Sequence, residues 1–436
     1  MTGSAPPAGP ADTASDVAAA TEAGIDFTAF DCDNHYYEAP DAFIRHVPPA
    51  MRRRCVEWCE IDGRRYHVVG GTVSHAVKNP TFDPVAPAGA LVDFFRGNPD
   101  GMNPLEALSK DNAIPLPGDF MDDRDARVDR VRGFGLEAVW LFPTLGMLYE
   151  ELLVGDVEAI TTTFGAFNRW VEEDWGFAYE DTIFGAPYLS LADVDWACRE
   201  LEWALDRGAR TVVMRPAAVP TAEGLQNPFD ERFDPFWSRV NEAGVTVVVH
   251  ASDAGRSGNG YLDRTFSASF EGSFRPSIAF YDIERAAEDW LLELMFNRMF
   301  ERFPNLRVAS VENGSSFLPG LVQKLGSQHK KMMEAWWKEH PVDQFRRHVW
   351  INPFWEDRLD DVVAVMGPDR VIFGSDWPHI EGMPAPLDYV AEVAHADDYT
   401  KRRVLRENVR ELNDHATSGP SDPTPPPTAA TAGDPA

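Results

Sequence analysis

The chain has 436 residues, of which 40 are Lys or Arg and 70 are Asp or Glu, so its formal net charge is -30. A protein of this charge is repelled by a phosphate backbone, which argues against nucleic acid as a partner. Hydrophobic residues make up 44% of the sequence and include 27 Phe and 13 Trp, enough for one large core and an aromatic pocket lining.

The sequence carries no sign of export or membrane insertion. Its N-terminal segment lacks the basic and continuously apolar regions of a signal peptide, and no stretch approaches the roughly 20 apolar residues of a membrane helix. The four cysteines, Cys32, Cys55, Cys59 and Cys198, form no CxxC pair, which fits a reducing compartment. We therefore expect a soluble, cytoplasmic protein with no membrane partner.

In chain order, two tails flank one folded domain. Residues 1–24 and 417–436 are rich in Ala, Pro, Thr, Ser and Gly, and such segments cannot offset the entropy of ordering, so both are expected to be disordered. The domain between them, residues 25–416, contains eight short apolar runs that predict strands. These runs lie near residues 28–33, 137–142, 184–189, 211–214, 246–250, 307–311, 349–352 and 371–375.

Segments of helical periodicity separate most of these strands, and several end at Gly or Pro, where a helix stop is expected. They are 125–133, 157–175, 194–208, 233–244, 283–303, 318–340 and 360–366. Eight strands alternating with helices predict an α/β fold, a TIM (β/α)8 barrel, which commonly reaches this length as a single domain.

Two connections are too long for a simple crossover. The first insert, about residues 36–121, follows the first strand and includes a hairpin-like stretch from Ile61 to Tyr66. The second, about residues 251–281, is a loop insert after the fifth strand. Both leave the carboxyl ends of strands, where barrel enzymes build their pockets, so they are expected to be pocket walls or lids. A peripheral subdomain that makes homo-oligomer contacts is an equal alternative for the first insert.

The first strand ends in an unusual polar run. Alternate side chains of a strand share a face, so Asp31, Asp33 and His35 point to one side. Burying a carboxylate without a partner is costly, so either this strand lies on the surface or a cation lies at its end.

Later strands favour the cation. His250 follows the fifth strand, Glu312 the sixth and Asp376 the eighth, with His379 just beyond. Residues at the carboxyl ends of barrel strands converge although they lie far apart in sequence. The nitrogen and oxygen donors together suit Zn, Mn or Fe better than Ca or Mg, and we expect one divalent ion per chain. The candidate ligands are Asp33, His35, His250 and Asp376.

Four motifs of this chain are Asp31-Cys32-Asp33-Asn34-His35, Val249-His250, Val311-Glu312-Asn313-Gly314 and Phe373-Gly374-Ser375-Asp376-Trp377-Pro378-His379. They resemble the metal motifs of the amidohydrolase-related group typified by aminocarboxymuconate-semialdehyde decarboxylase and the resorcylate decarboxylases. The resemblance covers roughly residues 27–412, and its most specific part is the last motif. It implies a distorted (β/α)8 barrel that holds a divalent metal through Asp33, His35, His250 and Asp376, with Asp376 also carrying a proton.

The chain departs from that group at three positions. Asp33 and His35 replace the two histidines that many relatives have on the first strand, a variant also found among its decarboxylases. Glu312 occupies the position that often carries a catalytic histidine. Arg215, after Met214, ends the fourth strand where binuclear amidohydrolases use a carbamylated lysine, which argues against the usual two-zinc hydrolase.

The proposed site carries an excess of negative charge. Asp33, Glu312 and Asp376, with Glu38 as a candidate fourth, would surround one divalent ion. Carboxylates ~4 Å apart repel by ~4 kcal/mol at an effective dielectric of about 20. Protonation of Glu312, a nearby Arg215 or a second metal could relieve this repulsion.

The first hypothesis is therefore a metal-dependent enzyme that decarboxylates or hydrolyses a small carboxylated organic molecule in a catabolic or natural-product pathway. In it, Asp376 moves the proton, His379 or Glu312 assists, and Arg215 pairs with a substrate carboxylate. For Arg215, a structural salt bridge is an equal alternative.

Two other functions stay open. Carboxylates interleaved with His35, His250 and His379 also resemble the ligands of two irons that activate oxygen, so a diiron monooxygenase that hydroxylates an apolar acid, such as a terpenoid or an aromatic one, is the second hypothesis. The third is a catalytically inactive binding barrel, although none of the four candidate ligands is missing.

Overall fold

The computed structural model describes residues 14–77, 79–255, 278–331 and 336–426. Its centre is a ring of parallel strands in two hydrogen-bonded sheets. The first contains β1 (Ala29–Tyr36), β5 (Leu136–Pro143) and β6 (Ile183–Gly185). The second contains β7 (Thr211–Met214), β10 (Thr246–His250), β11 (Arg307–Val311) and β12 (Val349–Ile351).

Isolated parallel bridges join these two sheets into a barrel. Tyr188 pairs with Val213 on one side, and Ile351 pairs with Val371 on the other. The segment that begins at Val371 then reaches β1, because Cys32 donates its N–H to Phe373 O at 2.9 Å and Asp376 donates its N–H to Asp33 O at 2.8 Å. The predicted TIM barrel is confirmed, and it is distorted because its last strand is held by single bridges instead of a continuous ladder.

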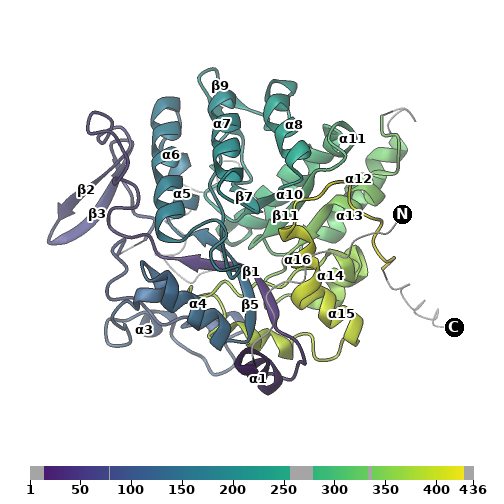
Figure 1. Cartoon of the computed structure of the whole chain (residues 1–436), viewed down its shortest axis with the longest axis horizontal. Helices are drawn as coiled ribbons and strands as arrows, with labels where there is room; N and C mark the ends of the chain where they lie inside the picture. The colour runs from purple at the N-terminus through teal and green to yellow at the C-terminus, as the bar shows by residue number, and fades with distance from the viewer. Residues whose placement is uncertain (1–13, 78, 256–277, 332–335, 427–436) are drawn as a thin grey trace.

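Helices cover the barrel, as Figure 1 shows for α6, α7 and α8, which stand side by side. Among the longer helices, three begin at an aspartate whose carboxylate accepts the N–H three residues on, which satisfies an otherwise unpaired donor. These are Asp123, Asp156 and Asp193, before α4 (Arg124–Gly133), α6 (Val157–Asp174) and α7 (Val194–Leu205). Further helices are α8 (Asp234–Ala243), α10 (Asp282–Phe296), α11 (Met299–Arg302), α12 (Leu318–Lys331), α13 (Pro341–His348) and α14 (Leu359–Met366).

The first insert contains a small antiparallel sheet of β2 (Val56–Ile61), β3 (Arg64–Val69) and β4 (Thr72–Val73), which confirms the expected hairpin. The β2–β3 hairpin projects from one side of the barrel (Figure 1). The insert continues through α2 (Val92–Phe95), α3 (Pro104–Ala107) and the turn Gly118–Phe120. Of the expected second insert, residues 256–277 lie outside the described residues.

The chain differs from the sequence prediction at its N-terminal end. Residues 1–24 were expected to be a disordered tail, whereas Ala14–Glu22 form α1. Ala20 is fully buried there, since its backbone lies against Gly135, so a tertiary contact orders a segment of tail-like composition. Residues 1–13 and 427–436 of the expected tails lie outside the described residues, and residues 417–426 are described without helix or strand.

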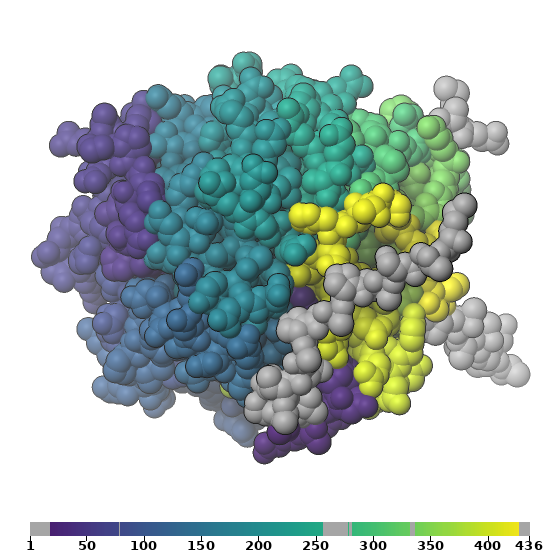
Figure 2. Space-filling view, viewed as in Figure 1, coloured from purple at the N-terminus to yellow at the C-terminus, as the bar shows by residue number. Residues whose placement is uncertain are grey.

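The C-terminal part of the domain adds α15 (Asp398–Arg402), a π-helical turn (Arg403–Glu407) and α16 (Asn408–Asn413). These residues, yellow in Figure 2, lie on the face between the teal and green segments of the barrel. Within the described ranges, no helix combines the length and apolar character needed to cross a membrane.

Glu137 on β5 anchors these C-terminal helices. Its side chain is 8% exposed and forms ion pairs with Arg406 and Arg410. Breaking a buried pair costs about 3–5 kcal/mol, and because Arg410 is 41% exposed we expect Glu137→Gln to lower the free energy of unfolding by about 2 kcal/mol in urea titrations. Glu202→Gln, which breaks an exposed pair with Arg239, should change it by less than about 0.5 kcal/mol. Equal effects of the two substitutions would contradict this role of Glu137.

Candidate metal centre

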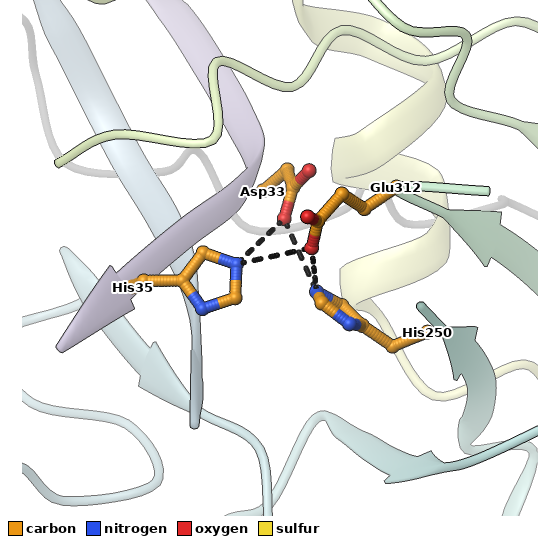
Figure 3. A group of neighbouring side chains, drawn as sticks. All are labelled: Asp33, His35, His250 and Glu312. Atoms are coloured by element: carbon orange, nitrogen blue, oxygen red, sulfur yellow. Dashed lines mark ion pairs between the residues drawn. The ribbon is translucent and has the colours of Figure 1, made fainter. Parts of the chain in front are cut away.

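Four side chains from three strand ends meet at the carboxyl mouth of the barrel (Figure 3). His35 Nε2 lies 3.3 Å from Asp33 Oδ1 and 3.6 Å from Glu312 Oε2. His250 Nε2 lies 3.4 Å from the same Asp33 oxygen and 3.3 Å from the same Glu312 oxygen. We call these residues the first ligand group. Their donor atoms lie within 4.8 Å of one another, so all can reach one ion.

The imidazoles of this group are oriented by their other nitrogen. His35 Nδ1 donates to Pro143 O at 3.1 Å, and His250 Nδ1 donates to Ala251 O at 2.9 Å. Each Nε2 therefore faces the centre and carries the lone pair once the ring is neutral, which is the tautomer that metal ligation requires. Both Nε2 atoms and Asp33 Oδ1 are buried without a hydrogen-bond partner. Buried polar atoms are normally satisfied, so three unsatisfied atoms around one point are the arrangement that a cation completes.

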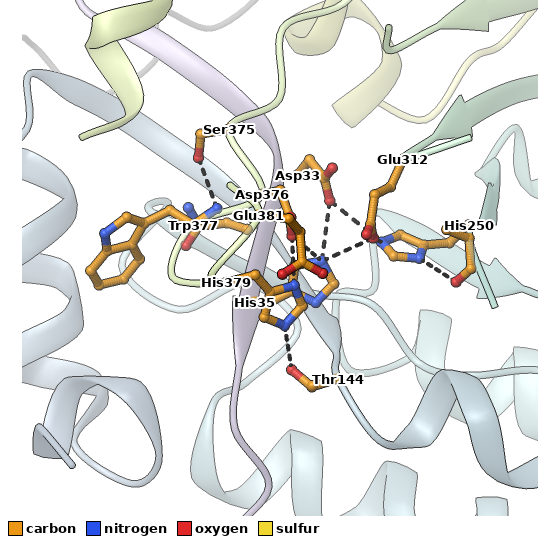
Figure 4. A network of polar contacts seen from close by, with 12 residues as sticks. Asp33, His35, Thr144, His250, Glu312, Ser375, Asp376, Trp377, His379 and Glu381 are labelled. Atoms are coloured by element: carbon orange, nitrogen blue, oxygen red, sulfur yellow. Dashed lines mark hydrogen bonds and ion pairs between the residues drawn. The ribbon is translucent and has the colours of Figure 1, made fainter. Parts of the chain in front are cut away.

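A second set of side chains adjoins the first on the loop after the last strand (Figure 4). Asp376 Oδ1 lies 3.5 Å from His35 Nε2 and 2.6 Å from His379 Nδ1. The second ligand group contains Glu312, Asp376, His379 and Glu381, whose donor atoms also lie within 4.8 Å of one another. Glu312 belongs to both groups. The sequence analysis missed Glu381, although its position two residues after His379 in the same loop was an available signal.

Thr144 at the end of β5 orients His379. The Thr144 hydroxyl donates to Tyr36 O at 2.8 Å, so it can accept from His379 Nε2 at 2.9 Å. His379 Nδ1 then keeps its lone pair on the side of Asp376. Burial, followed by the neighbouring His35 and His250, lowers the pKa of His379 well below its usual value.

Unusual backbone conformations direct two of the carboxylates. Glu312 and Asp376 both have φ of 55°, a left-handed conformation that is uncommon outside glycine. The Glu312 N–H donates to Asn352 Oδ1 at 3.1 Å, and the Asp376 N–H donates to the backbone of Asp33. Strain of this kind persists where surrounding contacts enforce it and clusters at functional sites.

Asp31 joins the strands that carry the two groups. Its Oδ1 accepts from the Ser375 N–H at 2.9 Å and from the Asp33 N–H at 3.0 Å, while its Oδ2 accepts from the Ser375 hydroxyl at 2.5 Å. Burial is the main cause that raises the pKa of Asp31 to about 7. Asp31 thus lies behind the ligands and fixes Asp33 relative to the loop of Asp376.

The metal-free site retains protons. Burial and the repulsion of Glu312 raise the pKa of Asp376 well above its usual value, and the same two causes raise that of Glu381 to about 7. Burial opposes a charge on His35, but the carboxylates of Asp33 and Glu312 near its Nε2 outweigh this effect and raise the pKa of His35 to about 10. A bound cation would replace these protons.

Two expected site residues lie in other contacts. Arg215 Nε pairs with Glu150 at 2.9 Å and its Nη1 pairs with Glu151 at 2.7 Å. Glu38 Oε1 accepts the N–H groups of Leu145 and Gly146 at the start of α5 (Gly146–Leu152). Within the described residues, neither Arg215 nor Glu38 belongs to a cluster that could hold a metal.

Comparison with known proteins gives the family of this chain. Residues 143–412 match the amidohydrolase family. The chain belongs to this enzyme family. It is also similar to the crystal structure of an amidohydrolase from Mycobacterium avium subsp. paratuberculosis K-10, with 36% identity, a TM-score of 0.82, and coverage of 90% of this chain and 100% of that one.

More distant relatives are decarboxylases. A 2-amino-3-carboxymuconate-6-semialdehyde decarboxylase from Dictyostelium discoideum is 24% identical over 129 residues, which are 28% of this chain and only 35% of that protein. A dihydroxybenzoic acid decarboxylase from Polaromonas sp. JS666, with bound manganese and 2-nitroresorcinol, is 16% identical with a TM-score of 0.56, covering 89% of this chain and 97% of that one. At 16% identity, the similarity to the Polaromonas enzyme shows a shared fold and no more.

The retained proton on His35 makes metal binding dependent on pH. Below its pKa of about 10, a metal ion must displace that proton, so each unit of rise in pH should strengthen apparent Mn²⁺ affinity by about tenfold between about pH 6 and 8. Calorimetric titration in buffers of different protonation enthalpy should show release of at least one proton per ion. An affinity independent of pH would contradict this protonation state.

Proposed function

We propose that this amidohydrolase-family chain is a metal-dependent enzyme that removes carbon dioxide from, or hydrolyses, a small carboxylated organic molecule, with decarboxylation as the leading reaction. The observation that carries the proposal is the convergence of Asp33 Oδ1, His35 Nε2 and His250 Nε2, all buried and without a hydrogen-bond partner. Manganese in the similar decarboxylase from Polaromonas sp. JS666 supports a divalent ion here, and Zn, Mn and Fe all suit these donors.

A divalent ion bound by the first ligand group would polarise an oxygen of the substrate. The residues of the chain handle the proton. Asp376 has a strongly raised pKa and lies 2.6 Å from His379 Nδ1, so the two share a proton at the mouth of the site. In decarboxylation, Asp376 gives that proton to the carbon that bears the carboxylate. The bond to the carboxylate then breaks, its electron pair stays with the substrate, and carbon dioxide leaves.

Glu312 and Arg215 take different parts in this proposal. Glu312 faces both imidazoles of the first ligand group, so it serves as a further ligand or as a proton partner of Asp376. Arg215 is 4% exposed and is already paired with two glutamates, so we assign it to the framework of the barrel mouth instead of to the substrate carboxylate.

The role of Asp376 is open to a direct test. Asp376→Asn keeps the shape of the side chain but cannot exchange a proton, so kcat should fall by about 10² to 10⁴-fold. The assay would follow carbon dioxide release from a panel of aromatic acids that includes 2,6-dihydroxybenzoate and 5-carboxyvanillate. Asp360→Asn, at an exposed aspartate paired with His395, is the control and should keep wild-type activity. Full activity of a folded Asp376→Asn variant would remove Asp376 from the mechanism.

One observation favours a second candidate, a two-iron monooxygenase. The first and second ligand groups share Glu312, and together they supply four carboxylates and three imidazoles. Four negative charges are balanced better by two divalent ions than by one, and two irons among such ligands could activate oxygen for hydroxylation of an apolar acid.

Metal content separates the two candidates. For decarboxylation we expect about one Mn or Zn per chain, measured on protein purified without added metal, and turnover that continues without oxygen. About two Fe per chain, with oxygen consumed as substrate disappears, would establish the second candidate instead. Tight ligand binding that survives exhaustive chelation would contradict both and support a binding barrel.

A further inference from the structure

We propose that residues 82–91 of the first insert, the clamp segment, position the metal centre by holding residues 376–383, the metal loop, from outside. The clamp segment contributes no ligand itself. It sets where Asp376, His379 and Glu381 lie relative to the first ligand group. The inference rests on the proposed metal centre but concerns a part of the chain to which that proposal gives no role.

The first argument is the hydrogen bonding of the metal loop. Four consecutive carbonyl groups of the loop each accept a hydrogen bond from outside it, and three of the four donors belong to the first insert. The pairs, donor first, are Tyr37 Oη and Pro378 O (3.2 Å), Gly89 N and His379 O (2.9 Å), Leu91 N and Ile380 O (2.8 Å), and Trp355 Nε1 and Glu381 O (2.9 Å). The clamp segment thus bonds the residue His379 itself and the residue next to Glu381.

The second argument is the close approach of the two segments at Gly89. Its φ is +67°, and a Cβ at this position would lie 2.6 Å from Cγ, 2.7 Å from Cδ and 2.7 Å from N of Pro384, just after the metal loop. Distances below 3.0 Å do not occur at real Cβ atoms. Only glycine lets the clamp segment come near enough to donate its two backbone hydrogen bonds.

The clamp segment is in turn fixed to the barrel, so it can act as a support. Phe82 stacks on Tyr37 with ring centroids 4.3 Å apart, and Tyr37 directly follows β1. Val85 and Ile114 exchange both backbone hydrogen bonds, at 2.9 and 2.8 Å, so the clamp segment is also bonded to a later part of the first insert. The support therefore begins on the strand that carries Asp33 and His35 and ends on the loop that carries the second ligand group.

Groups that orient metal ligands affect metal binding without touching the ion, and their loss commonly lowers affinity by about 10 to 100-fold. The test compares Gly89→Ala with two variants of the same insert, Gly97→Ala and Gly101→Ala. All three glycines have positive φ, but a Cβ at Gly97 or Gly101 meets nothing within 4 Å. The controls therefore introduce the same kind of backbone strain without the collision.

The probe is Co²⁺, whose visible absorption reports its coordination. Gly89→Ala should lower Co²⁺ affinity or stoichiometry and change the absorption spectrum, whereas both controls should match the wild type. Gly89→Ala/Pro384→Ala, which removes two of the three colliding atoms, should recover part of the loss. If folded Gly89→Ala protein has the affinity and spectrum of the wild type, the inference is wrong. If the wild type itself binds no Co²⁺, the proposed metal centre fails instead.

A second measurement needs no variant and covers the case in which Gly89→Ala does not fold. If the clamp segment favours the metal-binding position of the loop, metal must favour the clamped position equally, because coupling between two sites is reciprocal. Adding Co²⁺ to the wild-type protein should therefore slow hydrogen exchange at the amides of Gly89 and Leu91. Unchanged exchange at these amides, with metal bound, would overturn the inference.

Discussion

The repulsion among carboxylates at the barrel mouth is the constraint on which the site depends. Asp33, Glu312, Asp376 and Glu381 approach one another in a place largely closed to water, where like charges interact strongly. A fold can keep such groups together only if protons or cations neutralise them. The raised pKa values of Asp376 and Glu381 indicate that protons neutralise the site in the metal-free chain. The donor atoms of the first ligand group that lack a hydrogen-bond partner indicate that a cation can replace them.

The barrel is what makes this convergence achievable. Parallel strands deliver ligands from residues hundreds of positions apart to one rim, and backbone conformations with positive φ turn Glu312 and Asp376 inward at the ends of their strands. Asp31 then links the first and last strands behind the ligands. Each of these contacts restricts the positions that the ligands can take. The stability of the surrounding fold therefore offsets the repulsion among the carboxylates.

Much of this arrangement could be predicted from the sequence because the decisive signals are local. Strands such as Thr246–His250 and Arg307–Val311 are apolar runs that end in a polar ligand, and they lie at the predicted residues. The motif from Phe373 to His379 marked the last strand, although it forms bridges instead of a regular strand.

What could not be predicted depends on contacts distant in sequence. Arg215 was placed correctly at the end of β7, but its partners Glu150 and Glu151 lie more than 60 residues earlier. Glu381 lies two residues after a recognised motif, which marks its closeness to the site, but in an irregular loop no periodicity shows that its side chain points toward Glu312 and Asp376. The helix α1 forms in a segment of tail-like composition because of one tertiary contact at Ala20.

The contact between β1 and the segment that follows β12, which closes the barrel, has a consequence for biosynthesis. The strand that supplies Asp33 and His35 is synthesised well before β12, whereas the loop that supplies Asp376 and His379 is synthesised after it. A nascent chain that ends at β12 contains the residues of the first ligand group but lacks Asp376, His379 and Glu381 of the second. The two ligand groups can therefore meet only after the segment that follows β12 has been synthesised and has docked on β1. Ion capture by the whole set would report that this docking has taken place.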